Sequence, residues 1–161
     1  MGKPITTGDN RPLYHADFFR WTQEQGRLLR AGVARGLDWE NLAEEVETLG
    51  RSERREIRSR LVVLLLYLLK WQFQPRARSY GWQGTLLEQR RQLEEALSDS
   101  PSLRDYPREV LDAVYAPARL KAAGETGLPV EALPETCPYT VEQILDAAFL
   151  PDAGASEPPR E

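Results

Sequence analysis

Apolar residues in the middle of the chain recur at intervals of three and four, which is the spacing of one face of an α-helix. The stripe consists of Leu42, Val46, Leu49, Ile57, Leu61, Leu64 and Leu68. Asp38 is placed to cap such a helix and Pro75 to end it, so we predict a long helix over residues 39–74. Gly50 leaves open whether this helix is continuous or broken.

The stripe widens into an uninterrupted apolar run from Leu61 to Leu69. This run is too short to cross a bilayer, because a membrane-spanning helix needs about 20 apolar residues. Arg60 and Lys70 also close it at both ends. Since its apolar side chains point in every direction, other elements must enclose it. We therefore predict the central helix of a bundle, with the second half more deeply buried.

The remaining helices are predicted from apolar spacing and from capping residues. They cover residues 16–31, 81–97, 102–123 and, after a cap at Thr140, 141–148. The inward positions of the first are Phe18, Trp21, Leu28 and Leu29. Pro107 and Pro117 are expected to kink or break the third. The predicted fold class is all-α, a four-helix bundle with a long central helix and a short C-terminal helix.

The chain is expected to have four parts: an extended segment (1–14), the helical bundle (15–124), a proline-rich segment with the short helix (125–151), and a disordered tail (152–161). The net charge of −4 is unevenly distributed. Residues 125–161 hold eight acidic residues and one basic residue, hence −7. Residues 1–124 hold 17 acidic and 20 basic residues, hence +3. Neither value is typical of a dedicated nucleic-acid-binding domain.

Few residues offer catalytic or metal chemistry. The single cysteine, Cys137, cannot form an intrachain disulfide, which favours a reducing, cytoplasmic location. The single histidine, His15, precedes the first predicted helix, and the chain has no nucleophile motif and no phosphate-binding glycine loop. Glu44, Glu45 and Glu47 are expected to be solvated, because di-iron bundles also use histidines. We predict no catalytic residue, no metal site and no cofactor.

Several long blocks of sequence together resemble a known family. They are DFFRWTQEQGRLLRAG, LDWENLAEEVETLGRSERREIRSRLVVLLLYLLKWQFQP, WQGTLLEQRRQLEEALSDSPSL and LPETCPYTVEQILDAAFLP. In this order, from about Tyr14 to Pro151, they resemble the bacterial domain of unknown function family 29. The resemblance implies a small, all-helical, cytoplasmic bacterial protein, and it implies no activity. Relatives often have histidine where this chain has Tyr67, which puts in doubt any mechanism that needs an imidazole there.

Polar residues that interrupt the apolar stripes form one candidate site. A charge buried in a stripe needs a partner, so Glu53 and Arg60 suggest a polar pocket around a ligand. The candidate ligand-binding residues are Glu53, Arg60, Tyr67, Trp71, Gln89 and Arg90. The alternative is an internal ion pair, or side chains that reach solvent at the bundle surface. An intrahelical pair of Glu56 with Arg60 would compete with a ligand for the guanidinium.

Arginines of the central helix form a second candidate site. Arg51, Arg54, Arg55 and Arg58 make this segment locally basic and could contact a nucleic-acid strand. The alternative is a solvated helix face whose arginines pair with nearby acids.

The leading hypothesis is a non-catalytic interaction protein that binds a protein partner or itself, because arginine, tryptophan and tyrosine are common interface anchors. An alternative is a ligand-binding or enzymatic bundle with a polar interior around Glu53, Arg60 and Trp71. Weak nucleic-acid binding is a third hypothesis and the least favoured of the three. No membrane partner is expected.

Overall fold

The structure, a computed structural model, describes residues 10–153 and contains only helices and connecting turns in this range. The predicted all-α class is therefore confirmed. The helices are α1 (Arg11–Ala16), α2 (Phe18–Arg30), α3 (Trp39–Phe73), α4 (Tyr80–Asp99), α5 (Tyr106–Thr126) and α6 (Val141–Leu145). Short 3₁₀ turns are η1 (Pro75–Ala77), η2 (Pro101–Leu103) and η3 (Val130–Ala132).

The chain divides into two compact units, residues 1–52 and residues 53–161. The sequence predicted a single bundle over 15–124, but α2 belongs to the first unit whereas α4 and α5 belong to the second. Burial explains where the division falls. From Leu49 to Glu56 every residue of α3 is exposed, so these two turns of the helix contribute no buried side chain to a common core.

The long helix forms as its capping and breaking residues predict. The carboxylate of Asp38 accepts a hydrogen bond from the backbone N–H of Asn41 at 3.3 Å, which satisfies one unpaired donor of the first turn. The helix includes Gly50, so the break that glycine permits does not occur. It ends at Phe73, and Pro75 opens the following 3₁₀ turn.

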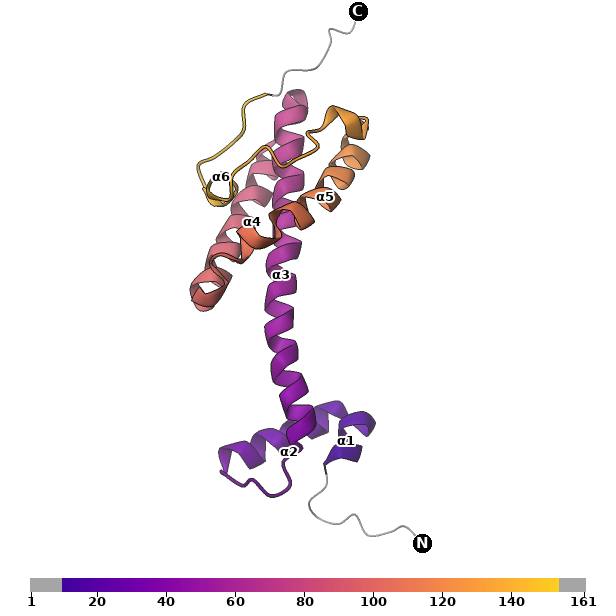
Figure 1. The fold of residues 1–161 in the computed structure, drawn as a ribbon, viewed down its shortest axis with the longest axis vertical. Coiled ribbons are helices and arrows are strands. Elements are labelled where there is room, and N and C mark those ends of the chain that lie inside the picture. The colour runs from indigo at the N-terminus through magenta and orange to yellow at the C-terminus, as the bar shows by residue number, and fades with distance from the viewer. Residues whose placement is uncertain (1–9, 154–161) are drawn as a thin grey trace, which may run out of the picture. The chain divides into compact units, whose positions relative to one another are not determined.

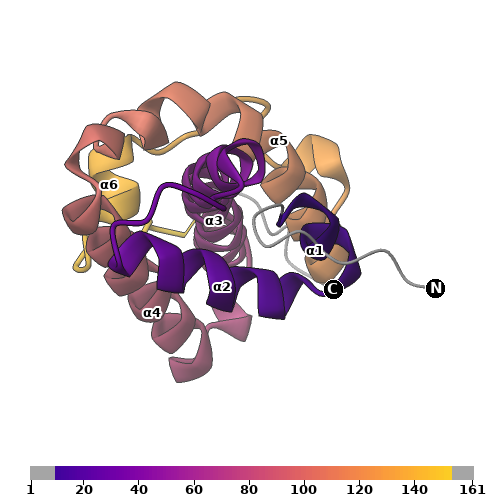
Figure 2. The same ribbon diagram turned by 90° about the horizontal axis from the view of Figure 1, so that it is seen from below.

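In the second unit, the C-terminal half of α3 is enclosed by the other elements (Figure 1). Its buried leucines pack against α4, α5 and the segment after α5. Seen along α3, α4 and α5 lie on different sides of it, and α6 contacts both of them (Figure 2). This enclosure is the reason for the all-round apolar run. No helix between residues 10 and 153 is both long and apolar enough to cross a membrane.

Two prolines occur in α5 without breaking it, so the break that was one of the two expected effects does not occur. Pro107 lies in the first turn of α5, where the missing N–H would have no intrahelical partner. Pro117 lies inside the helix, which nevertheless continues to Thr126. The left-handed Gly127 (φ 71°) then ends it. Ser102, the expected start of this helix, belongs instead to η2.

The segment after α5 crosses the second unit and carries α6. Thr140 caps α6 as predicted, with a reciprocal bond between Gln143 and the backbone of Thr140. The helix ends at Leu145, three residues before the predicted end. Disorder was expected from residue 152, and residues 154–161 lie outside the described range.

In the first unit, a short helix replaces the end of the segment expected to be extended. Pro12 stands in the first turn of α1, where its fixed φ favours a helix. Residues 1–9 lie outside the described range. Asp17 caps α2 by accepting a bond from the backbone of Arg20 at 3.0 Å. Trp21 is buried as predicted, whereas Phe18 is half exposed.

Candidate functional site

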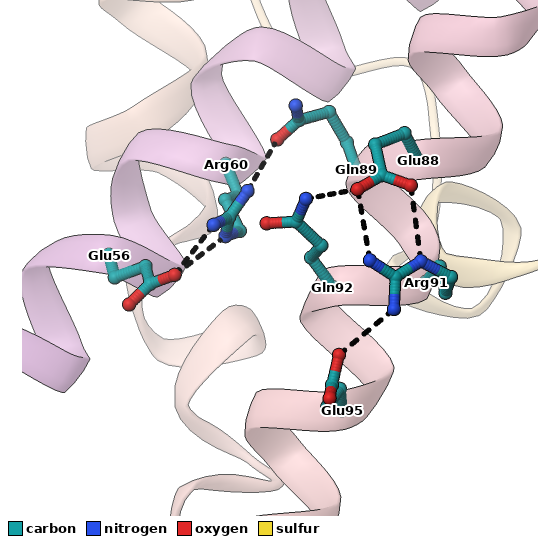
Figure 3. A network of polar contacts seen from close by, with 7 residues as sticks. All are labelled: Glu56, Arg60, Glu88, Gln89, Arg91, Gln92 and Glu95. Carbon is teal, nitrogen blue, oxygen red and sulfur yellow. Dashed lines mark hydrogen bonds and ion pairs between the residues drawn. The ribbon is translucent and has the colours of Figure 1, made fainter.

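Polar side chains of the second unit gather between α3 and α4 (Figure 3). Arg60 of α3 donates from Nε and Nη2 to one carboxylate oxygen of Glu56, at 3.0 and 2.6 Å. Its Nη1 donates to Oε1 of Gln89, on α4, at 3.4 Å. The intrahelical pair that would compete with a ligand for Arg60 is therefore the pair that forms.

A second group of contacts in this network surrounds Arg91 on α4. Its guanidinium donates to both carboxylate oxygens of Glu88, at 3.1 and 3.0 Å, and to Glu95 at 3.0 Å. Gln92 also donates to Glu88. The bonds from Arg91 and Gln92 hold the pKa of Glu88 at about 2. Because these side chains are exposed, such ion pairs contribute little to stability.

An acidic hollow of about 440 Å³ lies beside the network. Its lining residues are Glu53, Glu56, Arg91, Gln92, Glu95, Ala96 and Asp99. Glu53 accepts a hydrogen bond from Oγ of Ser100 at 2.7 Å. Of the six predicted ligand-binding residues, Glu53 is the one that lines this hollow. Between residues 10 and 153, no three His, Cys, Asp or Glu side chains are grouped so as to hold a metal ion.

Tyr67 contacts a lysine instead of Glu53 or Arg60. The ammonium of Lys70 lies 4.6 Å from the ring centre of Tyr67 and 4.7 Å from that of Trp82. It also pairs with the carboxylate of Glu125 at 2.7 Å. A lysine charge that is largely removed from water is thus stabilised by two ring faces and one carboxylate. This arrangement gives Tyr67 a structural role.

Trp71 is buried and belongs to a third set of contacts. The guanidinium of Arg78 lies over its ring, 4.9 Å from the ring centre. Nε of Arg78 also donates to the carbonyl of Trp71 at 2.8 Å. These contacts fix the turn between α3 and α4.

Arg90 anchors the C-terminal segment. Arg90 is buried in the second unit, where only 4% of its surface is exposed. Nε donates to the carbonyl of Ile144 at 2.8 Å, and Nη2 donates to that of Phe149 at 2.9 Å. Longer contacts reach the carbonyls of Gln143 (3.4 Å) and Ala147 (3.5 Å). Burial lowers the pKa of this guanidinium. The six predicted ligand-binding residues therefore do not form one pocket: they divide among the acidic hollow, the α3–α4 network, the Lys70 contacts, the Arg78 contacts and this anchor.

Comparison with models of known protein families identifies the family of this chain. The model of a domain of unknown function, DUF29, matches residues 13–150, which includes α2 to α6 entirely. The chain belongs to the DUF29 family. Comparisons with curated proteins and with solved structures gave no match. The resemblance inferred from the sequence is thereby confirmed.

The arginines considered for nucleic-acid binding in this DUF29 chain differ in their contacts. Arg51 donates to Glu44 at 2.6 Å and to Thr48 at 2.7 Å. Arg54 lies over the ring of Tyr106, 5.4 Å from its centre. Within residues 10–153, Arg55 and Arg58 make neither a hydrogen bond nor an ion pair through their guanidinium groups. Two of the four are therefore available to an anionic ligand.

The first unit of the DUF29 chain has a small polar centre at the turn between α2 and α3. Nε1 of Trp21 donates to Asp38 at 3.1 Å, and the backbone N–H of Asp38 donates to Oε1 of Gln25 at 2.8 Å. All three residues are buried. They fix the start of α3 relative to α2. Leu28 is the other buried apolar side chain among residues 10–52.

The same unit exposes two apolar helix faces, and this corrects the predicted core. We call Phe18, Phe19 and Leu29 the α2 face, and Trp39, Val46 and Leu49 the α3 stripe. Val46 and Leu49 were predicted to be buried, but they are 66% and 69% exposed. Phe18 and Leu29, predicted to face inward, are about half exposed. Val46 and Leu49 share one side of α3, as the predicted stripe requires, but no element of the described first unit covers them.

Proposed function

We propose that this DUF29 chain is a non-catalytic interaction protein whose first unit binds another protein chain through the α2 face and the α3 stripe. The supporting observation is the exposure of large apolar residues in a unit with a small core. Phe19, Trp39, Val46 and Leu49 are all more than 60% exposed. Several large apolar side chains exposed on so small a unit are typical of a protein-binding surface.

The energetics of the first unit support the proposal. Its described part, residues 10–52, buries two large apolar side chains, Trp21 and Leu28. Units of this size without disulfides or metal need added burial to be stable. Covering one leucine-sized side chain contributes about 1.5–3 kcal/mol. Covering the α3 stripe would therefore stabilise the unit as well as provide binding energy.

The alternative functions have weaker support. A ligand pocket around Glu53, Arg60 and Trp71 would need these side chains to converge, yet each makes contacts with different neighbours. Nucleic-acid binding would depend mainly on Arg55 and Arg58. Because each phosphate contact adds only a modest electrostatic gain, two arginines would give weak, salt-sensitive binding. We also propose a cytoplasmic location, which the single cysteine favours.

The proposal is tested by photo-crosslinking of the whole chain in its own cells. A photoreactive residue replaces Leu49 in one variant and Glu44 in the control, which lies about 140° away around the same helix. We expect discrete crosslinks to a protein chain, this chain included, from position 49 and none from position 44. The absence of crosslinks from position 49, or equal crosslinking from both positions, would contradict the proposal.

A further inference from the structure

The two apolar faces of the first unit have rims of opposite charge. On α2, Arg20 and Arg30 are exposed and make no ion pair within residues 10–153. Their positions on the helix lie next to that of Phe19, on the side away from Phe18, and so at the edge of the α2 face. On α3, the exposed carboxylates of Glu40 and Glu47 lie beside Trp39 at the edge of the α3 stripe. Glu47 lies 3.6 Å from the guanidinium of Arg51 in an exposed pair, which leaves Glu40 as the rim carboxylate without an ion pair among residues 10–153. One chain thus presents a basic-rimmed apolar helix and an acidic-rimmed apolar helix.

Resting on the proposed function, we infer that the protein chain bound by the first unit is a second copy of this chain, with the α2 face of each copy on the α3 stripe of the other. Two surfaces that complement each other on the same molecule can pair twice about a two-fold axis and close the assembly. In this arrangement arginines meet glutamates at both contacts, whereas α2 on α2 or α3 on α3 places like charges together.

The exposed apolar surface of the first unit is large enough for the interface of a stable dimer. The exposed surface of the α2 face, the α3 stripe and Val33 amounts to roughly 900 Å², because these seven residues are between 42% and 73% exposed. A standard specific interface buries about 800 Å² on each partner. Gly26 lies among the residues of the α2 face, and a Cβ atom there would meet no atom within 4 Å. A helix of the second copy can therefore approach α2 closely.

The first test is the mass of the full chain in solution, measured by sedimentation equilibrium. We expect a dimer at micromolar concentration and a dissociation constant at least about 100-fold weaker for Leu49→Glu, because the variant buries a charge in the contact. Leu120→Glu is the matched control, since Leu120 is 64% exposed on α5 of the second unit. We expect it to dimerise like the wild type.

The second test uses charge reversal to examine the pairing itself. Arg20→Glu/Arg30→Glu makes both rims acidic, and Glu40→Arg/Glu47→Arg makes both rims basic. Each variant alone should dimerise at least about tenfold more weakly than the wild type, and an equimolar mixture should recover heterodimers. Circular dichroism confirms that each variant is folded.

Three results would overturn the inference: a monomeric wild type, a Leu49→Glu variant that dimerises like the wild type, or charge variants whose mixture is no tighter than either alone. A monomeric wild type combined with crosslinks from position 49 to a different protein would overturn self-association and leave the proposed function intact. A monomer without any such crosslink would overturn both.

Discussion

Replacing Arg90 with methionine should release the C-terminal segment from the second unit. The guanidinium makes two short bonds, to the carbonyls of Ile144 and Phe149, and is almost fully buried. Each charge-assisted bond contributes about 1.5–3 kcal/mol, and the variant also leaves buried carbonyls without donors. Relief from burying a charge offsets part of this loss. Methionine preserves most of the apolar stem, so we expect a net loss of about 3 kcal/mol.

Urea denaturation measures this loss, and hydrogen exchange locates it. Exchange should accelerate at the amides of residues 141–149. Arg91→Met is the matched control, because Arg91 is the neighbouring residue but forms only exposed pairs with Glu88 and Glu95. It should cost less than about 1 kcal/mol. Equal losses for the two variants, or unchanged exchange in 141–149, would refute the assignment of Arg90 as an anchor.

Three further predictions concern single side chains of the second unit. Lys70→Met should lower the free energy of unfolding by about 1–2 kcal/mol in urea titrations, because the lysine loses two ring contacts and an ion pair. Burial raises the pKa of the Cys137 thiol, so iodoacetamide at pH 8 should alkylate it at least about tenfold more slowly in the folded chain than in urea. The pKa of Glu88 is held at about 2, below its ordinary 4.5, so its ionisation stabilises the fold above pH 4.5 and this contribution is lost as the pH falls to about 2. Glu88→Gln should therefore lower Tm slightly at pH 7 and leave it unchanged near pH 2; equal differences at both pH values would contradict this assignment.

The helices were largely predictable because their limits depend on local chemistry. Asp38 and Thr140 cap the helices that the sequence assigned to them, and each does so through its own side chain. Pro75 likewise marks the end of α3. Pro117 was expected to kink or break α5, and the break does not occur, since the helix continues past the position where one backbone bond is missing.

The polar contacts were less predictable because their partners are distant in sequence. The helical spacing correctly placed Arg90 next to a buried stripe. Its acceptors are backbone carbonyls more than 50 residues away, and a carbonyl has no residue-specific sequence signal. In contrast, Glu56 and Arg60 are four residues apart on one helix, and their pair was among the alternatives.

The exposure of the α3 stripe shows that the contacts of apolar residues are also difficult to predict from sequence. A periodic apolar face indicates that the face is favourable to cover, but it does not identify the element that covers it. The sequence assigned Val46 and Leu49 to the same core as Leu61 and Leu64. In the structure only the second pair is enclosed within its unit, and the exposure of the first pair is the basis of the proposed binding surface.

The central claim is that another protein chain covers the α3 stripe, and hydroxyl-radical footprinting tests it most directly. Modification of Trp39 and Leu49 is measured in intact cells and in the dilute purified chain, with Tyr80 as the control because it is 90% exposed in the second unit. We predict that Trp39 and Leu49 are protected in cells relative to the dilute chain, while Tyr80 reacts equally in both. Equal modification of all three residues under both conditions would contradict the claim.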